Sequence, residues 1–217
     1  MLRFRAAWLL LLAPVVLNAQ DLQLSEHISL PIPEGWEVGK QLSPANDLHY
    51  HTLYNPKTQQ KLLILNGLIE EWQSQCKVDA RVRECVKEQL QEKGLAERDK
   101  LLQSYQKKII SGPDVVNKQV NEQNELLRFS WIAQDNNIVD LNSATQETPL
   151  FYDCFVIGYI FNDKYVTHLT MIDIVDQPQD CKKREAFIDE IAWAVRVIED
   201  KAQQQDDNKE KPATEPN

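Results

Sequence analysis

The sequence predicts an α+β protein: a largely antiparallel β-sheet with a helical insertion, covered by a C-terminal amphipathic helix. Three observations lead to this fold class. Short β-rich runs occupy the N-terminal third, a region rich in Glu, Lys and Gln interrupts them, and a long hairpin then runs into a final helix-patterned segment. Strands placed before and after a helix, without regular alternation, are typical of α+β folds.

The first nineteen residues have the organisation of a secretory signal peptide. Arg3 and Arg5 are the positive region, residues 6–17 are an almost unbroken apolar run, and Ala19 is the small residue that cleavage requires. The apolar run is shorter than the roughly 20 residues that span a bilayer, and no cysteine follows it to accept a lipid anchor. We therefore expect cleavage before Gln20, a periplasmic or secreted protein, and no stable membrane insertion afterwards.

The length and net charge of the remaining chain limit its domain organisation and its possible partners. Without residues 1–19 the 217-residue chain keeps 198 residues, and the loss of Arg3 and Arg5 changes its formal net charge from −9 to −11. This length suits a single α+β domain, expected over residues 20–200. Residues 201–217 contain no large apolar side chain and are expected to form a disordered polar tail. Because an acidic protein repels phosphate groups, nucleic acid and anionic membrane surfaces are not expected partners.

The N-terminal third predicts three strands. The first covers residues 27–32 and ends at the prolines, which cannot donate to a β-ladder. Residues 46–54 and 61–69 are the second and third, and together the three suggest a meander. Between them, Gly35 permits a turn and Trp36 restarts an extended segment. Trp36 is interpreted as an aromatic residue that covers the sheet, and the alternative is a ligand-facing side chain.

A helical region is expected over residues 82–110. Val86 and Leu90 begin a partial apolar stripe of helical spacing. Gly94 interrupts the region, so two shorter helices or one kinked helix are both open. The Ser-Gly-Pro-Asp run at residues 111–114 is expected to end it.

Strands return after the helical region. They are expected over residues 118–122 and 126–134, followed by a polar loop at 138–149. The clearest hairpin joins residues 151–161 to 164–175 through Asn162-Asp163, and its first arm is apolar on both faces, as in a central strand. A closing helix is expected over about 182–203, with Asp180 as its N-cap.

Four cysteines lie after the signal segment: Cys76, Cys85, Cys154 and Cys181. In an exported chain an even number predicts two disulfides. A four-thiolate zinc site is the alternative, and it usually shows Cys-x-x-Cys pairs, which this chain lacks. Three pairings are open, and we favour the local pairs Cys76–Cys85 and Cys154–Cys181, each of which closes a loop near the start of a helix.

A local pattern, Leu30-Pro31, Pro33 and Glu34-Gly35-Trp36, follows the first predicted strand. Together with the order of elements over residues 27–200, this pattern resembles the PsbP/DcrB-like α/β/α sandwich family. The resemblance implies a non-enzymatic accessory or binding domain. It brings no catalytic residues to carry over.

One arrangement of histidines is a candidate metal site. His49 and His51 are two residues apart on a predicted strand, so their imidazoles project from the same face and suit two ligands of one ion. His168 is the first candidate for a third ligand, with His27 or Asp47 as substitutes. The chain has no phosphate-binding glycine loop, no G-x-S-x-G elbow and no H-E-x-x-H motif, so no cofactor is predicted.

Two functional hypotheses follow. The first is an exported, soluble, non-enzymatic accessory or interaction protein of the cell envelope, with an unknown protein partner. The alternative is a metal-dependent hydrolase or metal-binding protein that uses a cluster of His49, His51 and His168. Convergence of these side chains in the fold would discriminate between the two hypotheses.

Overall fold

The computed structural model describes residues 20–39, 50–72, 76, 82–105, 107–134 and 151–198, without the side chains of residues 70, 97–99 and 101–105. The predicted signal peptide, the polar tail at 201–217, the loop at 138–149 and His49 lie outside the described residues. No helix within the described ranges combines the length and the apolarity needed to cross a membrane.

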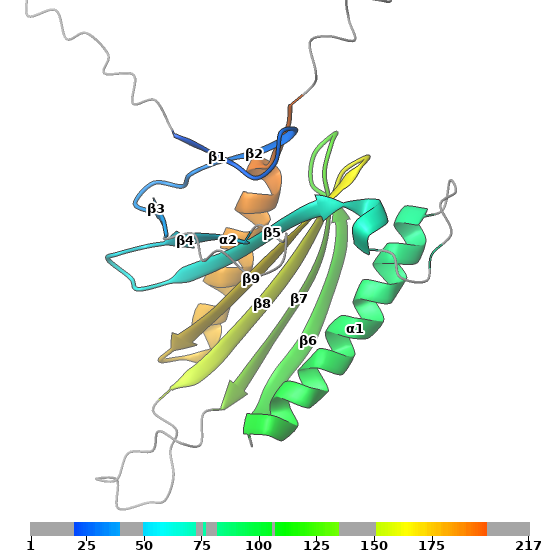
Figure 1. Ribbon diagram of the computed structural model, residues 1–217. Coiled ribbons are helices and arrows are strands. Elements are labelled where there is room, and N and C mark those ends of the chain that lie inside the picture. The colour runs from blue at the N-terminus through cyan, green and yellow to red at the C-terminus, as the bar shows by residue number, and fades with distance from the viewer. Residues whose placement is uncertain are drawn as a thin grey trace, which may run out of the picture.

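The strands form two antiparallel sheets (Figure 1). The large sheet has the order β3 (Glu37–Val38), β4 (Tyr50–Tyr54), β5 (Lys61–Leu68), β9 (Tyr165–Val175), β8 (Tyr152–Phe161), β7 (Glu125–Gln134) and β6 (Lys108–Gln119). The small sheet has the order β1 (Asp21–Gln23), β2 (Ile28–Pro31) and β10 (Arg196–Val197). This arrangement confirms the predicted α+β class.

The two α-helices pack on opposite faces of the large sheet (Figure 1). The helical elements are η1 (Ile69–Trp72), α1 (Val82–Tyr105), η2 (Pro178–Asp180) and α2 (Cys181–Ala194). We call the face covered by α2 and the small sheet the α2 face. We call the opposite face, against which α1 packs, the aromatic face, because Phe129, Trp131, Phe155 and Tyr159 lie on it. Each face has its own apolar core, so the sheet separates two buried layers.

Strand β8 is central, as its sequence predicts. Val156 and Ile160 point to the α2 face, whereas Phe155 and Tyr159 point to the aromatic face, and all four are buried. Because successive residues of a strand alternate between faces, a strand that is covered on both sides has to be apolar throughout. The turn at Asn162 also forms as predicted, with its side-chain Oδ1 accepting the Tyr165 N–H at 2.8 Å.

The prediction of a helix over 82–110 is wrong at the C-terminal end, and the observed helix is not interrupted in its middle. Helix α1 continues through Gly94, and β6 already begins at Lys108. The Ser-Gly-Pro-Asp run does not end an element but lies inside β6, where the pairing register with β7 shifts between Ser111 and Asp114. Gly112 has φ +93° and a Cβ there would lie 2.5 Å from the Ser130 carbonyl oxygen, so the strand bulges at a position that only glycine fits.

Two other expectations about the termini of the domain are corrected. The closing helix ends at Ala194 rather than near 203, because Val195 is extended and the next two residues pair with β2 as β10. The first predicted strand does not join the meander: β2 belongs to the small sheet, and β3, β4 and β5 form the meander. A β-branched segment after α2 supplies β2 with a second neighbour.

The N-terminal Trp36 packs against the closing helix. Its ring stacks on Phe187 of α2, with 4.7 Å between centroids and 10° between planes. Trp36 is half-buried beside the core of the α2 face. This position agrees with the interpretation of Trp36 as a packing residue, because its ring covers a helix that itself covers the sheet.

A buried ionic cluster sets the position of α2 on strand β7. Arg128, 6% exposed, donates to a carboxylate oxygen of Glu185 at 3.3 Å and also pairs with Asp189. The second carboxylate oxygen of Glu185 accepts the Ser130 hydroxyl at 3.0 Å. Buried charges require such partners because desolvation is costly, so this cluster restricts how α2 can rotate and slide on the sheet.

Candidate binding face

Aromatic rings lie opposite one another on the aromatic face because of the strand register. Trp131 on β7 is directly opposite Phe155 on β8, and their rings stack with 5.3 Å between centroids. Phe129, also on β7, meets the ring of Tyr159 on β8 edge to face at 6.3 Å. Direct and diagonal neighbours across antiparallel strands are close enough for such ring contacts. The result is a continuous aromatic layer across β7 and β8, which we call the aromatic surface of the sheet, and all four of its rings are buried.

His168 extends this surface onto β9. It is directly opposite Tyr159, and the two rings stack with 4.7 Å between centroids. The hydroxyl of Thr170 is 3.0 Å from its Nε2 atom. Burial lowers the pKa of His168 to about 4, so the imidazole is neutral near pH 7 and contributes to an apolar surface rather than a charged one.

Trp72 covers the upper end of the aromatic face. It comes from η1 and contacts both Tyr159 and His168 edge to face, at 5.9 Å and 5.8 Å between centroids. Gly67 on β5 leaves the space for this ring, because a Cβ there would lie 3.1 Å from the Trp72 indole nitrogen and 2.7 Å from a Glu71 carboxylate oxygen. The disulfide Cys76–Cys85 joins the chain after Trp72 to the start of α1.

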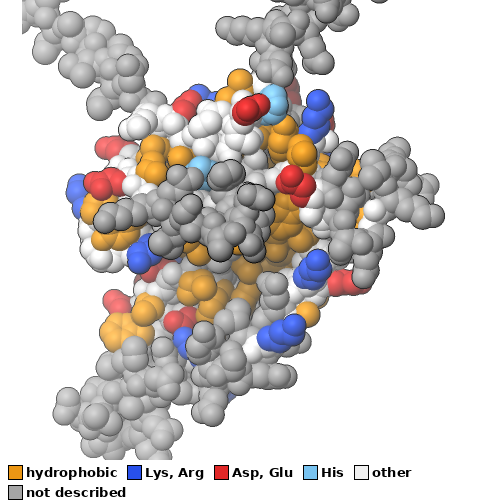
Figure 2. Space-filling model, in the orientation of Figure 1, with side chains coloured by type: hydrophobic (Ala, Val, Ile, Leu, Met, Phe, Trp, Pro, Cys, Tyr) orange, Lys and Arg blue, Asp and Glu red, His pale blue; other side chains and the backbone are white. Residues whose placement is uncertain are grey.

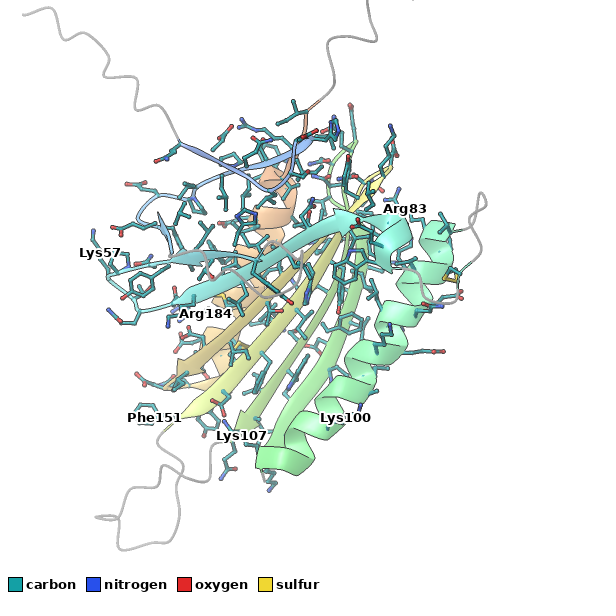
Figure 3. All side chains as sticks on the ribbon, viewed as in Figure 1. Lys57, Arg83, Lys100, Lys107, Phe151 and Arg184 are labelled. Atoms are coloured by element: carbon teal, nitrogen blue, oxygen red, sulfur yellow. A yellow bond between two sulfur atoms is a disulfide. The ribbon has the colours of Figure 1, made fainter. Side chains whose placement is uncertain are left out.

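Helix α1 is held against the aromatic face by ion pairs near both ends. At its start, Arg83 and Lys87 pair with Glu125 at 3.1 Å and 2.7 Å. Just after its last residue, Lys107 pairs with Asp153, whose side chain is buried at the other end of the sheet. Figure 3 shows Arg83 and Lys107 at opposite ends of the molecule, with α1 running between them. These pairs fix α1 over one side of the face only.

The other side of the aromatic face exposes apolar side chains. Leu63 on β5 is 46% exposed, and Ile172 and Ile174 on β9 are 52% and 57% exposed. Leu63 is opposite Thr170, and Ile172 is opposite the buried Phe155, so the exposed residues adjoin the aromatic surface. We call Leu63, Ile172 and Ile174 the apolar stripe. Figure 2 shows hydrophobic side chains gathered over this central part of the sheet.

The apolar stripe has the features of a contact surface. Scattered exposed apolar residues are common on proteins, but neighbouring ones on adjacent strands mark surfaces that associate with something else. Lys61 precedes Leu63 by two residues on β5 and is exposed on the same side. A ligand of this surface would therefore meet apolar side chains first and one positive charge at the margin.

The structure does not bring the predicted metal ligands His51 and His168 together. His51 is opposite Ile64, which is opposite Leu169 on the α2 face, so His168, the residue before Leu169 on β9, points to the other side of the sheet. Side chains on opposite faces cannot ligate one ion. His49 lies outside the described residues, and the described part of the chain contains no group of three His, Cys, Asp or Glu residues suited to a metal.

His51 instead lies beside a small pocket on the α2 side. The pocket, of about 340 Å³, is formed by β1, the β3–β4 region and residues such as Leu22, Ile32 and Thr52. His27, the suggested substitute ligand, lies beside Tyr165 at 5.8 Å between ring centroids. Asp47, the other substitute, is outside the described residues.

The two disulfides have the local connectivity that the sequence favoured. Cys76 is bonded to Cys85 and Cys154 to Cys181, with Cα–Cα distances of 5.9 Å and 5.5 Å. The second bond joins the central strand β8 to the first residue of α2, inside the core of the α2 face. Two disulfides indicate a protein of an oxidising compartment.

Sequence reasoning did not identify the apolar stripe. The signal was present in the hairpin arm YVTHLTMIDIV of β9, where Ile172 and Ile174 alternate with the residues that point to the α2 face. Trp72 had no such signal, since a single aromatic residue after a strand does not indicate which surface it covers.

No protein-family model matches this chain, and no curated protein sequence matches it.

Proposed function

We propose that this protein is an exported, non-enzymatic interaction protein of the cell envelope, and that it binds a protein partner through the apolar stripe. The observation that carries the proposal is the juxtaposition of Leu63, Ile172 and Ile174, each about half exposed, on neighbouring antiparallel strands beside a buried aromatic layer. The partner is a segment with apolar side chains and an acidic residue that meets Lys61. Interfaces combine such an apolar centre with a polar margin.

Three further observations support this function. The disulfides fit an oxidising compartment outside the cytoplasm. The apolar stripe lies on β5 and β9, which pair with each other and, through β9, with the central strand β8, so the surface is preorganised for association. The neutral state of His168 keeps its edge apolar near pH 7.

We also propose a relationship to PsbP/DcrB-like α/β/α sandwiches. The order of layers, with α1 on one face of the sheet and α2 on the other, supports that resemblance. A metal-dependent function is not proposed, because His51 and His168 face opposite sides of the sheet.

Site-specific photocrosslinking tests the proposed binding surface. A benzophenone side chain placed at Leu63 should give one discrete adduct with a native envelope fraction, whereas the same group at Ile198, which is exposed beside β10, should give none. Excess unlabelled wild-type protein should abolish the adduct, and excess Ile172→Asp/Ile174→Asp protein should not. An excess of the matched Ile198→Asp protein should compete as wild type does.

Two outcomes would overturn the proposed function. One is equal adduct formation at Leu63 and Ile198. The other is full competition by the Ile172→Asp/Ile174→Asp protein, because that result would mean that the adduct does not depend on the apolar stripe. Both substitutions are at exposed positions, so circular dichroism and thermal unfolding should confirm that the variants remain folded.

A further inference from the structure

Among the described residues, strand β6 is the outer strand of the large sheet and pairs with β7 alone (Figure 1). An outer strand directs every second N–H and C=O group away from the sheet, where another strand can pair with it. Helix α1 does not provide that strand. Its Gly94 packs against the ring of Phe129, with 3.6 Å from the Cβ position to the ring, so the helix lies over the aromatic face.

The two halves of β6 differ in their capacity to pair. The first half contains the register shifts and Pro113, which lacks an N–H group. Bulges and prolines protect an edge from further pairing. The second half, from Asp114 to Gln119, keeps an uninterrupted register with β7 and contains no proline. It is therefore the part of this edge that can accept another strand.

The sequence of this second half, Asp-Val-Val-Asn-Lys over residues 114–118, is complementary to itself. In an antiparallel pair of two copies centred on Val116, Asp114 of each copy lies opposite Lys118 of the other. Opposite charges placed directly across antiparallel strands stabilise the pair. Centring the pair on Val115 would bring Pro113 into the ladder, and centring it on Asn117 would remove the match of Asp114 with Lys118.

We propose that two copies of this protein associate through residues 114–118 of β6, so that their large sheets join into one. The charged side chains are available for this contact: Asp114 is 56% exposed and Lys118 is 42% exposed. Their present pairs with Lys182 and Asp189, at 3.2 Å and 2.8 Å, join side chains that are between 27% and 65% exposed. Surface pairs contribute little, so they can be exchanged for pairs across the dimer.

Charge reversal tests this contact in the purified full protein. Sedimentation velocity should show a concentration-dependent dimer for the wild type. Asp114→Lys and Lys118→Asp should each weaken the dimer by about tenfold or more in dissociation constant, because each places like charges opposite one another twice. The double variant Asp114→Lys/Lys118→Asp should restore wild-type association.

Mixing the two single variants gives a sharper test. A copy with Asp114→Lys has two lysines on this edge and a copy with Lys118→Asp has two aspartates, so the mixture should form a heterodimer that neither variant forms alone. Oxidation should also join two Val116→Cys copies at the symmetry centre. Two Gln119→Cys copies should stay apart, because residue 119 of one copy lies opposite residue 113 of the other.

The proposal is overturned by a wild type that remains monomeric at high concentration. It is equally overturned by single variants that dimerise as the wild type does, or by a mixture that fails to associate. Preferential crosslinking of Gln119→Cys over Val116→Cys would place the contact elsewhere and reject this register. The apolar stripe is on a different part of the sheet, so these results do not depend on the photocrosslinking experiment.

Discussion

The imidazole of His168 lies parallel to the phenol ring of Tyr159, with 4.7 Å between their centroids and 12° between their planes. Trp72 covers the edge of both rings. Protonation would place a positive charge inside this aromatic enclosure, where burial disfavours it. The stability of the protein should therefore depend on the protonation state of this single residue.

We expect stability to fall as the pH is lowered from 6.5 towards 4. His168 has a pKa of about 4 in the folded protein and its ordinary value of 6.5 in the unfolded chain. The folded state thus binds fewer protons than the unfolded state in this range. The contribution of neutral His168 to the free energy of unfolding is therefore fully present above the unfolded pKa and is lost as the pH falls towards the folded pKa. The shift corresponds to about 3 kcal/mol. Urea unfolding at about pH 7 and pH 4.5 measures the loss.

His168→Phe is the matched control for this titration, because it keeps an aromatic ring but cannot bind a proton. Between the two pH values the wild type should lose roughly 2–3 kcal/mol more than His168→Phe. Carboxylates titrate in both proteins, so only this difference reports on His168. Equal losses would show that the buried imidazole does not determine the acid response.

The two disulfides should contribute unequally to stability. Cys154–Cys181 closes a span of 27 residues and Cys76–Cys85 a span of 9. On the chain-entropy relation these spans correspond to roughly 3.5 and 2.5 kcal/mol. Cys154 and Cys181 are also completely buried, so alanines there would leave a cavity as well.

Guanidinium unfolding should therefore find Cys154→Ala/Cys181→Ala less stable than Cys76→Ala/Cys85→Ala. Each double substitution leaves no unpaired thiol, which keeps the comparison free of disulfide exchange. The opposite order would mean that the disulfide between the η1 region and α1 stabilises the protein more than the disulfide between β8 and α2.

Glu185→Gln should destabilise the protein by about 3 kcal/mol, because it leaves Arg128 with less compensating charge in a buried site. The matched control is Asp180→Asn, which weakens the more exposed Asp180–Lys183 pair, 2.8 Å long, at the start of α2. Asp180→Asn should lower the free energy of unfolding by less than about 1 kcal/mol. Thermal and denaturant unfolding of both variants compare the two positions, and a similar effect would argue against the clustered charges as the determinant of α2 position.

Two buried glycines should respond in opposite directions to alanine. At Gly94 the added Cβ would lie 3.6 Å from Phe129, an ordinary contact, so Gly94→Ala should stabilise α1 by about 0.5–1 kcal/mol. At Gly158 it would lie 2.9 Å from Ile188, so Gly158→Ala should overpack the interface of β8 with α2 and destabilise by roughly 1–3 kcal/mol. Equilibrium unfolding gives both signs, and a destabilised Gly94→Ala protein would contradict the packing of α1 on β7.

The fold class and the disulfide pairs could be predicted because local patterns determine them. The apolar hairpin around Asn162 and the spacing of Cys154 and Cys181 need no knowledge of distant partners. The boundary between α1 and β6 could not be predicted in this way. Gly112 and Pro113 form a turn signal in most contexts, but here pairing with β7 continues the strand through them.

The candidate site was less accessible to sequence reasoning than the fold. Whether His51 and His168 share a face depends on the register across β4, β5 and β9, and an odd offset places them on opposite sides. The position of Trp72 over Tyr159 likewise depends on contacts between segments far apart in the chain. Such relationships arise only once the strand order is known.

The insertion of β9 between β5 and β8 has a consequence for how the chain acquires its structure. During synthesis from the N-terminus, β5 emerges long before Tyr165–Val175, its inner neighbour, and β2 waits for Arg196–Val197. Strands β2 and β5 thus each lack one of their two neighbouring strands until a late stage of synthesis. We therefore expect the small sheet to be completed only after Arg196–Val197 has been synthesised, so that the polypeptide stays incompletely folded while most of it is being made.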